Sequence, residues 1–145
     1  MPLPFTDLVQ SIANHFDRSE STVTPNLPTS SQIGSYGERV AAAFLRRHGY
    51  KILVRNYLVT GGELDLVCRH KDALVFVEVR TRASDRFGRP GETIGAKKQD
   101  ALRHAGRRYL ELLDRDDIYY RFDAVEVMLK PGEVPVCTLL SNIFA

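Results

Sequence analysis

Acidic residues interrupt two short apolar runs of this chain, and their spacing is the first sign of chemistry. The run at residues 62–67 carries Glu63 and Asp65, and the run at residues 74–80 carries Glu78. Turn-forming residues bound both runs and separate them, which predicts two strands of an antiparallel hairpin. Acids are rare in such strands because a buried charge is costly unless it is compensated. These acids therefore need a partner.

The expected hairpin register brings the acids together. With the turn centred on residues 71–72, Asp65 lies directly opposite Glu78, and Glu63 lies opposite Arg80. Residues two apart on a strand share a face, so all four side chains point the same way. The aliphatic residues between them point to the other face and into a core.

Opposed acids on one sheet face repel each other, since their Cβ atoms are only about 5 Å apart. A divalent cation that takes an oxygen from each carboxylate would offset the repulsion of Asp65 and Glu78. Alternatively, Glu63 and Arg80 form a cross-strand ion pair, and one acid is protonated or reaches solvent. The spacing alone leaves both interpretations open.

Basic residues are concentrated beside these acids. The net charge of the 145 residues is only +2, but residues 80–108 carry nine Lys or Arg against three acids. A basic stretch next to an acidic cluster suits a polyanionic substrate held near a metal. A solvated helix with mixed charges is the structural alternative.

Cysteine usage and hydropathy predict a soluble cytoplasmic protein that does not bind a membrane. Cys68 and Cys137 lie in apolar runs without the spacing of a zinc site, so we expect reduced thiols. The N-terminus lacks the pattern of a signal peptide, and no apolar run approaches the ~20 residues that span a bilayer.

The N-terminal region is expected to be separate from the main domain. Residues 5–16 have the apolar spacing of an amphipathic helix, and the Ser/Thr/Pro-rich residues 19–31 predict a flexible linker. We therefore place an N-terminal region at residues 1–32 and one domain at residues 33–145.

The domain is predicted to be α/β, with a central mixed β-sheet flanked by helices. The expected elements are a helix at 34–48, a strand at 51–57, the two hairpin strands, a helix at 94–114 and strands at 121–129 and 134–140. The strand, helix, strand order near the end implies a right-handed parallel crossover. Glu38 lies early in the first helix, where it either complements the helix dipole or completes a three-carboxylate site.

The order of a helix with Glu38, a strand with Asp65 and a strand with Glu78 and Arg80 resembles the restriction-endonuclease-like superfamily, whose signature is PD-(D/E)xK. More narrowly, several motifs resemble the bacterial YraN-like family, which is similar to archaeal Holliday-junction resolvases. These motifs are GSYGE at 34–38, NY at 56–57, GELDL at 62–66, FVEVRTR at 76–82, KKQ at 97–99 and RFD at 121–123. The resemblance covers about residues 34 to 140 and implies a core in the order αβββαβ with an extra C-terminal strand.

The resemblance implies a metal-dependent endonuclease that hydrolyses phosphodiesters in structured or branched DNA. It assigns one or two Mg²⁺ or Mn²⁺ ions to Glu38, Asp65 and Glu78, which form the catalytic set together with Arg80. The expected partner is branched or single-stranded DNA, and the N-terminal helix is a candidate element of a homodimer. The basic residues expected to grip the nucleic-acid backbone are Arg82, Lys97 and Lys98, followed by Arg89, Arg103 and Arg107.

The sequence departs from the motif at Arg80, where the signature has lysine. An arginine stays cationic and can hold a phosphate in a bidentate manner, but it cannot act as a general base. The alternative function is therefore a non-catalytic nucleic-acid-binding or scaffold protein on a nuclease fold. Whether the chain is an enzyme stays open at this point.

Overall fold

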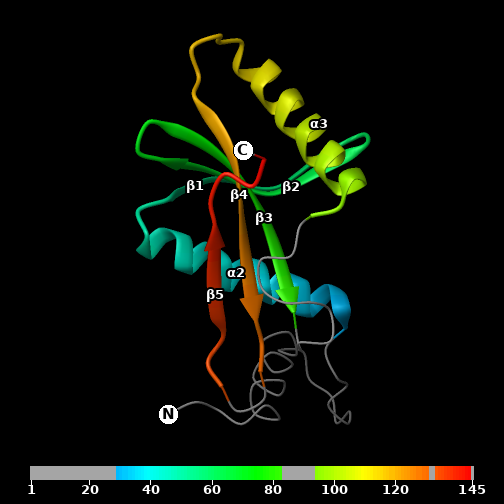
Figure 1. Cartoon of the computed structure of the whole chain (residues 1–145), viewed down its shortest axis with the longest axis vertical. Helices are drawn as coiled ribbons and strands as arrows, with labels where there is room; N and C mark the ends of the chain where they lie inside the picture. Colours follow the sequence, from blue (N-terminus) through cyan, green and yellow to red (C-terminus); the bar gives the residue numbers. More distant parts are fainter. Residues whose placement is uncertain (1–28, 83–93, 131–132, 145) are drawn as a thin grey trace, which may run out of the picture.

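The computed structural model describes residues 29–82, 94–130 and 133–144 and shows a five-stranded sheet with a helix packed on each face (Figure 1). The predicted N-terminal helix, most of the predicted linker and Arg89 lie outside the described residues. The elements are α2 (Ser30–Arg47), β1 (Lys51–Val59), β2 (Gly62–His70), β3 (Ala73–Arg82), α3 (Ala96–Leu113), β4 (Tyr120–Met128) and β5 (Val136–Leu140).

The strands lie in the order β1, β2, β3, β4, β5, and only the central pair β3 and β4 is parallel. The segment between these two strands contains α3, as the strand, helix, strand pattern requires. The predicted mixed sheet flanked by helices is confirmed. No helix in the described residues is long and apolar enough to cross a membrane.

Helix α2 begins at Ser30, four residues before the predicted start. A capping box fixes this end: the backbone N–H of Gln32 donates to Oγ1 of Thr29 over 3.2 Å, and the backbone N–H of Thr29 donates to Oε1 of Gln32 over 2.8 Å. The two bonds satisfy donors that a helix start otherwise leaves unpaired. The Ser/Thr-rich composition pointed to a linker and concealed this signal.

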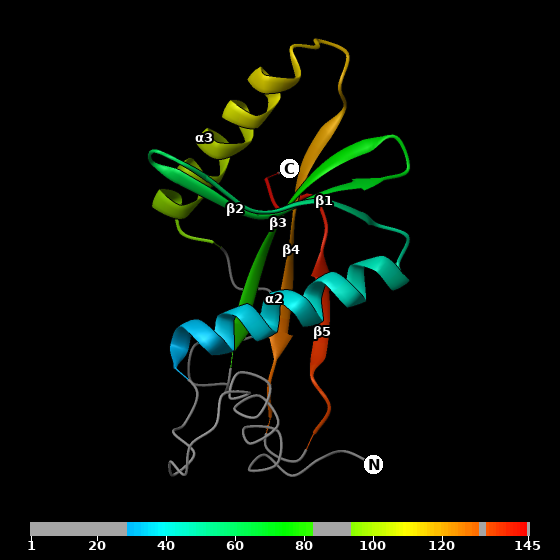
Figure 2. The same cartoon turned by 180° about the vertical axis from the view of Figure 1, so that it is seen from behind.

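Both faces of the sheet are buried at β3, whereas the hairpin pattern assigned a core to only one face of this strand. Alternate residues of β3 show this: Val75 and Val77 pack in the cluster beneath α2, and Phe76 packs with Leu102 of α3 and Phe122 of β4. Figure 2 shows α2 crossing the sheet. The face that carries Glu78 is therefore covered by protein as well.

At Asp65, the side chains of strand β2 switch from one face of the sheet to the other. Leu64 belongs to the cluster beneath α3 and Leu66 to the cluster beneath α2, although residues two apart normally share a face. The ladder with β3 ends where Leu66 pairs with Val77, while β2 stays paired with β1 as far as Gly62. The β1–β2 ribbon accordingly lies across the direction of β3 and β4 in Figures 1 and 2. Asp65 occupies the bend.

Candidate functional site

Close packing of α2 on β3 positions Glu38. A Cβ atom at Gly37 would collide with the side chain of Thr81, so only glycine lets the helix approach β3 this closely. Glu38 is the next residue and is partly buried. Burial raises the pKa of its carboxyl group, and the negative charges of Asp65 and Glu63 raise it further. Glu38 thus lies within electrostatic range of the hairpin acids.

Asp65 caps the end of the β2–β3 ladder. Its Oδ2 accepts a hydrogen bond of 2.8 Å from the backbone N–H of Val79, where a carbonyl of β2 would otherwise accept. The ladder ends where Leu66 pairs with Val77, one residue short of the predicted pair, but Asp65 lies close enough to Glu78 for its charge to raise the pKa of Glu78. The structure brings the two acids together, and the observed part of the ladder has the register that the sequence predicted.

Glu78 is a buried carboxylate that is only partly compensated. The residue is 8% exposed, and its Oε1 lies 3.2 Å from Nζ of Lys98 on α3. No N–H donor among the described residues reaches its buried Oε2, and the Asp65 carboxyl lies within hydrogen-bonding range of the Glu78 carboxyl. Burial and the charge of Asp65 raise the pKa of Glu78 to about 7, although Lys98 acts to lower it. The protein therefore holds a carboxylate in a place that disfavours its charge.

Arg80 forms an ion pair with Glu126, whereas the sequence offered Glu63 as its partner in one of the two open interpretations. The Arg80 guanidinium donates to Oε1 of Glu126 over 3.2 Å, and the two residues are direct neighbours in the parallel β3–β4 pair. Glu126 is 4% exposed, while Glu63 is exposed. Glu126 was missed, although it is an acid in an apolar strand just as Glu78 is.

The predicted nucleic-acid contacts fall into separate places. Lys98 reaches Glu78, and Lys97 lies beside it on the exposed first turn of α3. Arg103 and Arg107 are exposed on the same helix, about 8 and 14 Å farther along its axis at 1.5 Å per residue. Arg82 is half-buried at the end of β3.

The three predicted metal ligands influence one another electrostatically, but their carboxylates are not close enough together to form a preformed metal site. Asp65 raises the pKa of both Glu38 and Glu78, so it is the central member of the set. Across the parts of the chain that the structure describes, no three His, Cys, Asp or Glu side chains are grouped so that they could hold a metal ion. Their donor chemistry still suits a hard cation, because all are carboxylates and Glu78 has an unsatisfied buried oxygen.

Replacing Glu78 by glutamine should remove a pH-dependent loss of stability. The folded-state pKa of about 7 lies above the ordinary 4.5, so the folded protein binds more protons between these values and becomes less stable as the pH rises through them. We expect Glu78→Gln to match the parent near pH 5 and to exceed it by about 2 to 3 kcal/mol at pH 8. Urea unfolding in EDTA measures this difference, and an equal effect at both pH values would contradict it.

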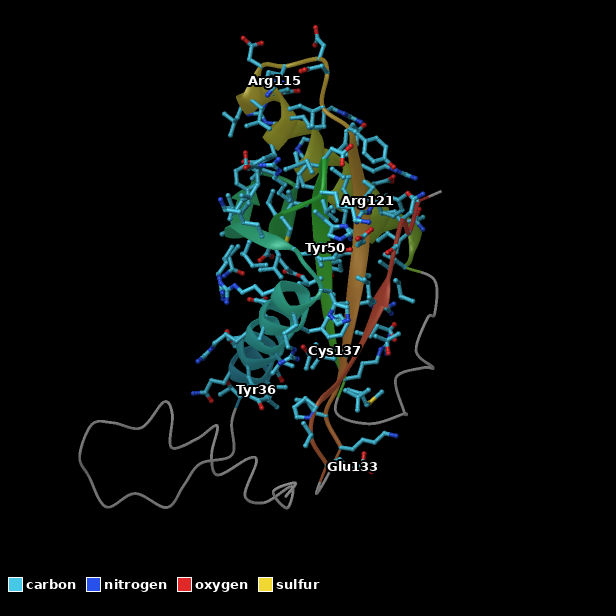
Figure 3. All side chains as sticks on the ribbon, turned by 90° about the vertical axis from the view of Figure 1, so that its left-hand side faces the viewer. Tyr36, Tyr50, Arg115, Arg121, Glu133 and Cys137 are labelled. Carbon is cyan, nitrogen blue, oxygen red and sulfur yellow. The ribbon has the colours of Figure 1, made fainter. Side chains whose placement is uncertain are left out.

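A second polar cluster, absent from the predictions, lies near the opposite end of β4. Asp123 is fully buried and accepts hydrogen bonds from Oη of Tyr50 at 2.9 Å, from Nε of Arg121 at 3.1 Å and from the backbone N–H of Asn142 at 2.9 Å. Arg121 also bonds to Tyr50 and to Nδ1 of His70, each over 3.1 Å. Figure 3 shows Tyr50 and Arg121 side by side. The RFD motif at 121–123 was the signal for this cluster.

Comparison with known proteins gives one consistent family. The model of the family described as "Uncharacterised protein family UPF0102" matches residues 37–127, a span that holds Glu38, Asp65, Glu78 and Glu126. A UPF0102 protein of Syntrophomonas wolfei is 44% identical over 102 residues, which cover 70% of this chain and 89% of that protein. One from Symbiobacterium thermophilum is 42% identical over 115 residues, which cover 79% and 98%. The chain therefore belongs to the UPF0102 family.

Proposed function

We propose that this protein is a metal-dependent endonuclease that hydrolyses phosphodiesters in structured or branched DNA. The observation that carries the proposal is the contact between Lys98 and Glu78, with Nζ 3.2 Å from Oε1. The signature expects a lysine beside this acid, and the sequence has Arg80 at that position. Lys98 supplies the amine from α3 instead.

Asp65 and Glu78 would hold the metal, and Glu38 would complete the set from α2. A bound Mg²⁺ or Mn²⁺ would polarise the phosphate and lower the pKa of an attacking water. Asp65 is fixed by the N–H of Val79, so its carboxylate keeps its orientation when the substrate arrives. The buried Oε2 of Glu78 offers an oxygen that has no hydrogen-bond donor within the described residues.

Lys98 and Arg80 have different parts in this proposal. The Lys98 side chain is 48% exposed, so it can reach both Glu78 and a substrate phosphate, and a lysine can exchange a proton where an arginine cannot. Arg80 is held by Glu126 and fixes the end of β3 next to the site. The departure from the signature at position 80 therefore does not remove the lysine from the site.

DNA would be held chiefly through its backbone. Lys97, Arg103 and Arg107 add exposed positive charge elsewhere on α3, and such contacts position a substrate without reading its sequence. Shape is then the basis of recognition, which suits junctions, flaps and single-stranded regions.

The direct test is incubation of the full chain with junction, flap and single-stranded DNA in Mg²⁺, in Mn²⁺ and in EDTA. We expect cleavage of at least one substrate that requires the metal and stops in EDTA. If DNA binds but no substrate is cut in either metal, hydrolysis is ruled out.

A non-catalytic DNA-binding protein is the second candidate, and the absence of a gathered three-ligand group in the described residues favours it. This function requires DNA affinity that falls steeply with salt, since neutralised phosphates release counterions. It also requires that added Mg²⁺ or Mn²⁺ causes no turnover. The same assays therefore separate the two functions.

Replacing Lys98 by methionine should slow cleavage about 100-fold or more in single-turnover experiments with saturating protein. The change removes a positioned cation and proton donor and keeps the aliphatic stem. Lys97→Met is the matched control, because it removes the same charge from the neighbouring residue, and we expect it to weaken DNA binding without slowing the saturated rate. Equal rates for the two variants would contradict a specific role for Lys98.

Loss of Lys98 also removes a charge that lowers the pKa of Glu78. Protonation of Glu78 could then account for slower cleavage near pH 7. Measuring Lys98→Met at pH 8.5 separates the effects, since a loss caused only by protonation recovers there and a loss of the amine does not.

A further inference from the structure

A basic pocket lies apart from the acidic site, between α3, the start of β4 and the segment that follows β5. It encloses about 370 Å³, and Arg103, Arg107, Tyr120, Asn142 and Phe144 are among the residues that line it. This volume falls in the range of pockets that hold small ligands. Neither the acids nor Lys98 contribute to its wall.

The pocket and the acidic site are at different levels of the sheet. Tyr120 pairs with Leu74 at the start of the parallel β3–β4 ladder, while Glu78 pairs with Ala124. Four residues of strand separate the two levels by about 13 Å. The two sites lie far enough apart to contact different parts of one extended ligand.

The charge available in the pocket comes from Arg103 and Arg107. They are exposed and lie four residues apart, which places them on one face of α3. Neither Arg103 nor Arg107 forms a salt bridge with another residue that the structure describes. Arg121 also lines the pocket, but its guanidinium is already bonded to Asp123. Two arginines can thus meet an anion.

Aromatic rings form the other half of the pocket. The guanidinium of Arg103 lies over the ring of Phe144, 4.5 Å from its centroid, which holds both groups in a defined orientation. Phe144 packs in turn on Phe122, and Tyr120 adds a ring that is 47% exposed. A ligand that fits this pocket therefore combines a negative charge with a flat ring.

We propose that the pocket binds one nucleotide, with its phosphate on Arg103 and Arg107 and its base on the exposed ring of Tyr120, next to the stacked Arg103 and Phe144 side chains. Arginine binds phosphate through paired hydrogen bonds, and bases of single strands stack on aromatic side chains. The proposal deepens and rests on the proposed function, because it assigns the pocket to an unpaired nucleotide of the DNA substrate. A free mononucleotide has the same chemistry and is the other source.

The experiment is calorimetric titration of the full chain in EDTA with dTMP, with inorganic phosphate and with a 5′-phosphorylated thymidine tetranucleotide. We expect Arg107→Gln to weaken binding of dTMP and the tetranucleotide at least tenfold. Arg108→Gln is the matched control: it removes the same charge from the neighbouring residue, which pairs with Glu111 outside the pocket, and should change the affinity less than twofold. Equal weakening by the two variants overturns the proposal.

Tyr120→Leu tests the aromatic half, because this exposed ring lines the pocket and is not the one that Arg103 stacks on. We expect it to weaken dTMP severalfold and to leave the weaker binding of inorganic phosphate unchanged. Phosphate that binds parental protein as tightly as dTMP does would overturn the proposal. Tighter binding of the tetranucleotide than of dTMP identifies a DNA strand as the source, and the reverse order identifies a free nucleotide.

The outcomes also separate this proposal from nuclease activity. The variant Asp65→Asn should keep full nucleotide binding, because Asp65 does not line the pocket. If nucleotide binding depends on Arg107 but the protein cuts no DNA, only the proposed nuclease activity is refuted. If the protein cuts DNA but its Arg107→Gln and Arg108→Gln variants bind dTMP equally well, only the proposed nucleotide-binding pocket is refuted.

Discussion

Replacing Asp65 by asparagine should reduce metal-dependent DNA cleavage at least about a thousandfold while the fold is retained. Asparagine keeps an oxygen that can accept the N–H of Val79, so the end of the β2–β3 ladder stays bonded. It removes the charge that lies between Glu38 and Glu78 and that a metal would need. A loss of several kcal/mol in transition-state stabilisation corresponds to this factor, at about 1.4 kcal/mol for each tenfold.

The loss cannot be attributed to protonation of Glu78. The charge of Asp65 raises the pKa of Glu78, so its removal favours ionised Glu78 near pH 7. Single-turnover cleavage measures the rate, and calorimetry with Mn²⁺ measures binding, which should weaken in parallel. Glu63→Gln, on the same strand and exposed, is the matched control and should cut normally. Equal rates for the two variants would remove Asp65 from the site.

The proximity of Asp65 and Glu78 was accessible from the sequence because it depends on two local rules. Strand residues alternate between faces, and a short turn fixes which residues face each other. The observed pairing from His70 with Ala73 to Leu66 with Val77 follows the predicted register. Local order along one hairpin was enough for this part of the site.

The partners of the site were not accessible, because they depend on how distant elements dock. Lys98 lies 20 residues beyond Glu78 and reaches it only if α3 presents that side chain to the sheet. Glu126 meets Arg80 through the parallel pairing of β3 with β4, 46 residues away. The spacing of apolar residues predicts which face of α3 is buried, but it does not predict where along the sheet the helix packs.

For the hairpin itself, the sequence predicted a core on one face only, although both faces of β3 are buried. Residues 75–78 are consecutively buried, as in a central strand covered by helices on both sides. The alternation of Glu78 and Arg80 with Val77 and Val79 predicted one polar face and one apolar face. The acids at the site therefore lie in a more protected place than the pattern indicated, and this burial is the main reason that the pKa of Glu78 is raised.

Replacing Asp123 by alanine should lower the free energy of unfolding by about 3 to 5 kcal/mol. The carboxylate is fully buried and accepts from Tyr50, Arg121 and the backbone N–H of Asn142, so its removal leaves three donors unsatisfied. The Arg121 side chain is only 16% exposed and would lose its counter-ion. Since domains of this size are stable by about 5 to 15 kcal/mol, this is a large part of the total.

The cost arises from burial, and a second ion pair provides the comparison. Arg115 and Asp117 are closer, at 2.7 Å, but their side chains are 65% and 70% exposed, so water replaces the lost contact. Asp117→Ala should therefore leave the urea midpoint almost unchanged, whereas Asp123→Ala should lower it with an unchanged slope. A similar midpoint for both variants would contradict a stabilising role for the buried cluster. Because Asp123 joins the segment before β1, the start of β4 and the segment after β5, its loss should also loosen the wall of the pocket lined by Arg103, Arg107 and Asn142.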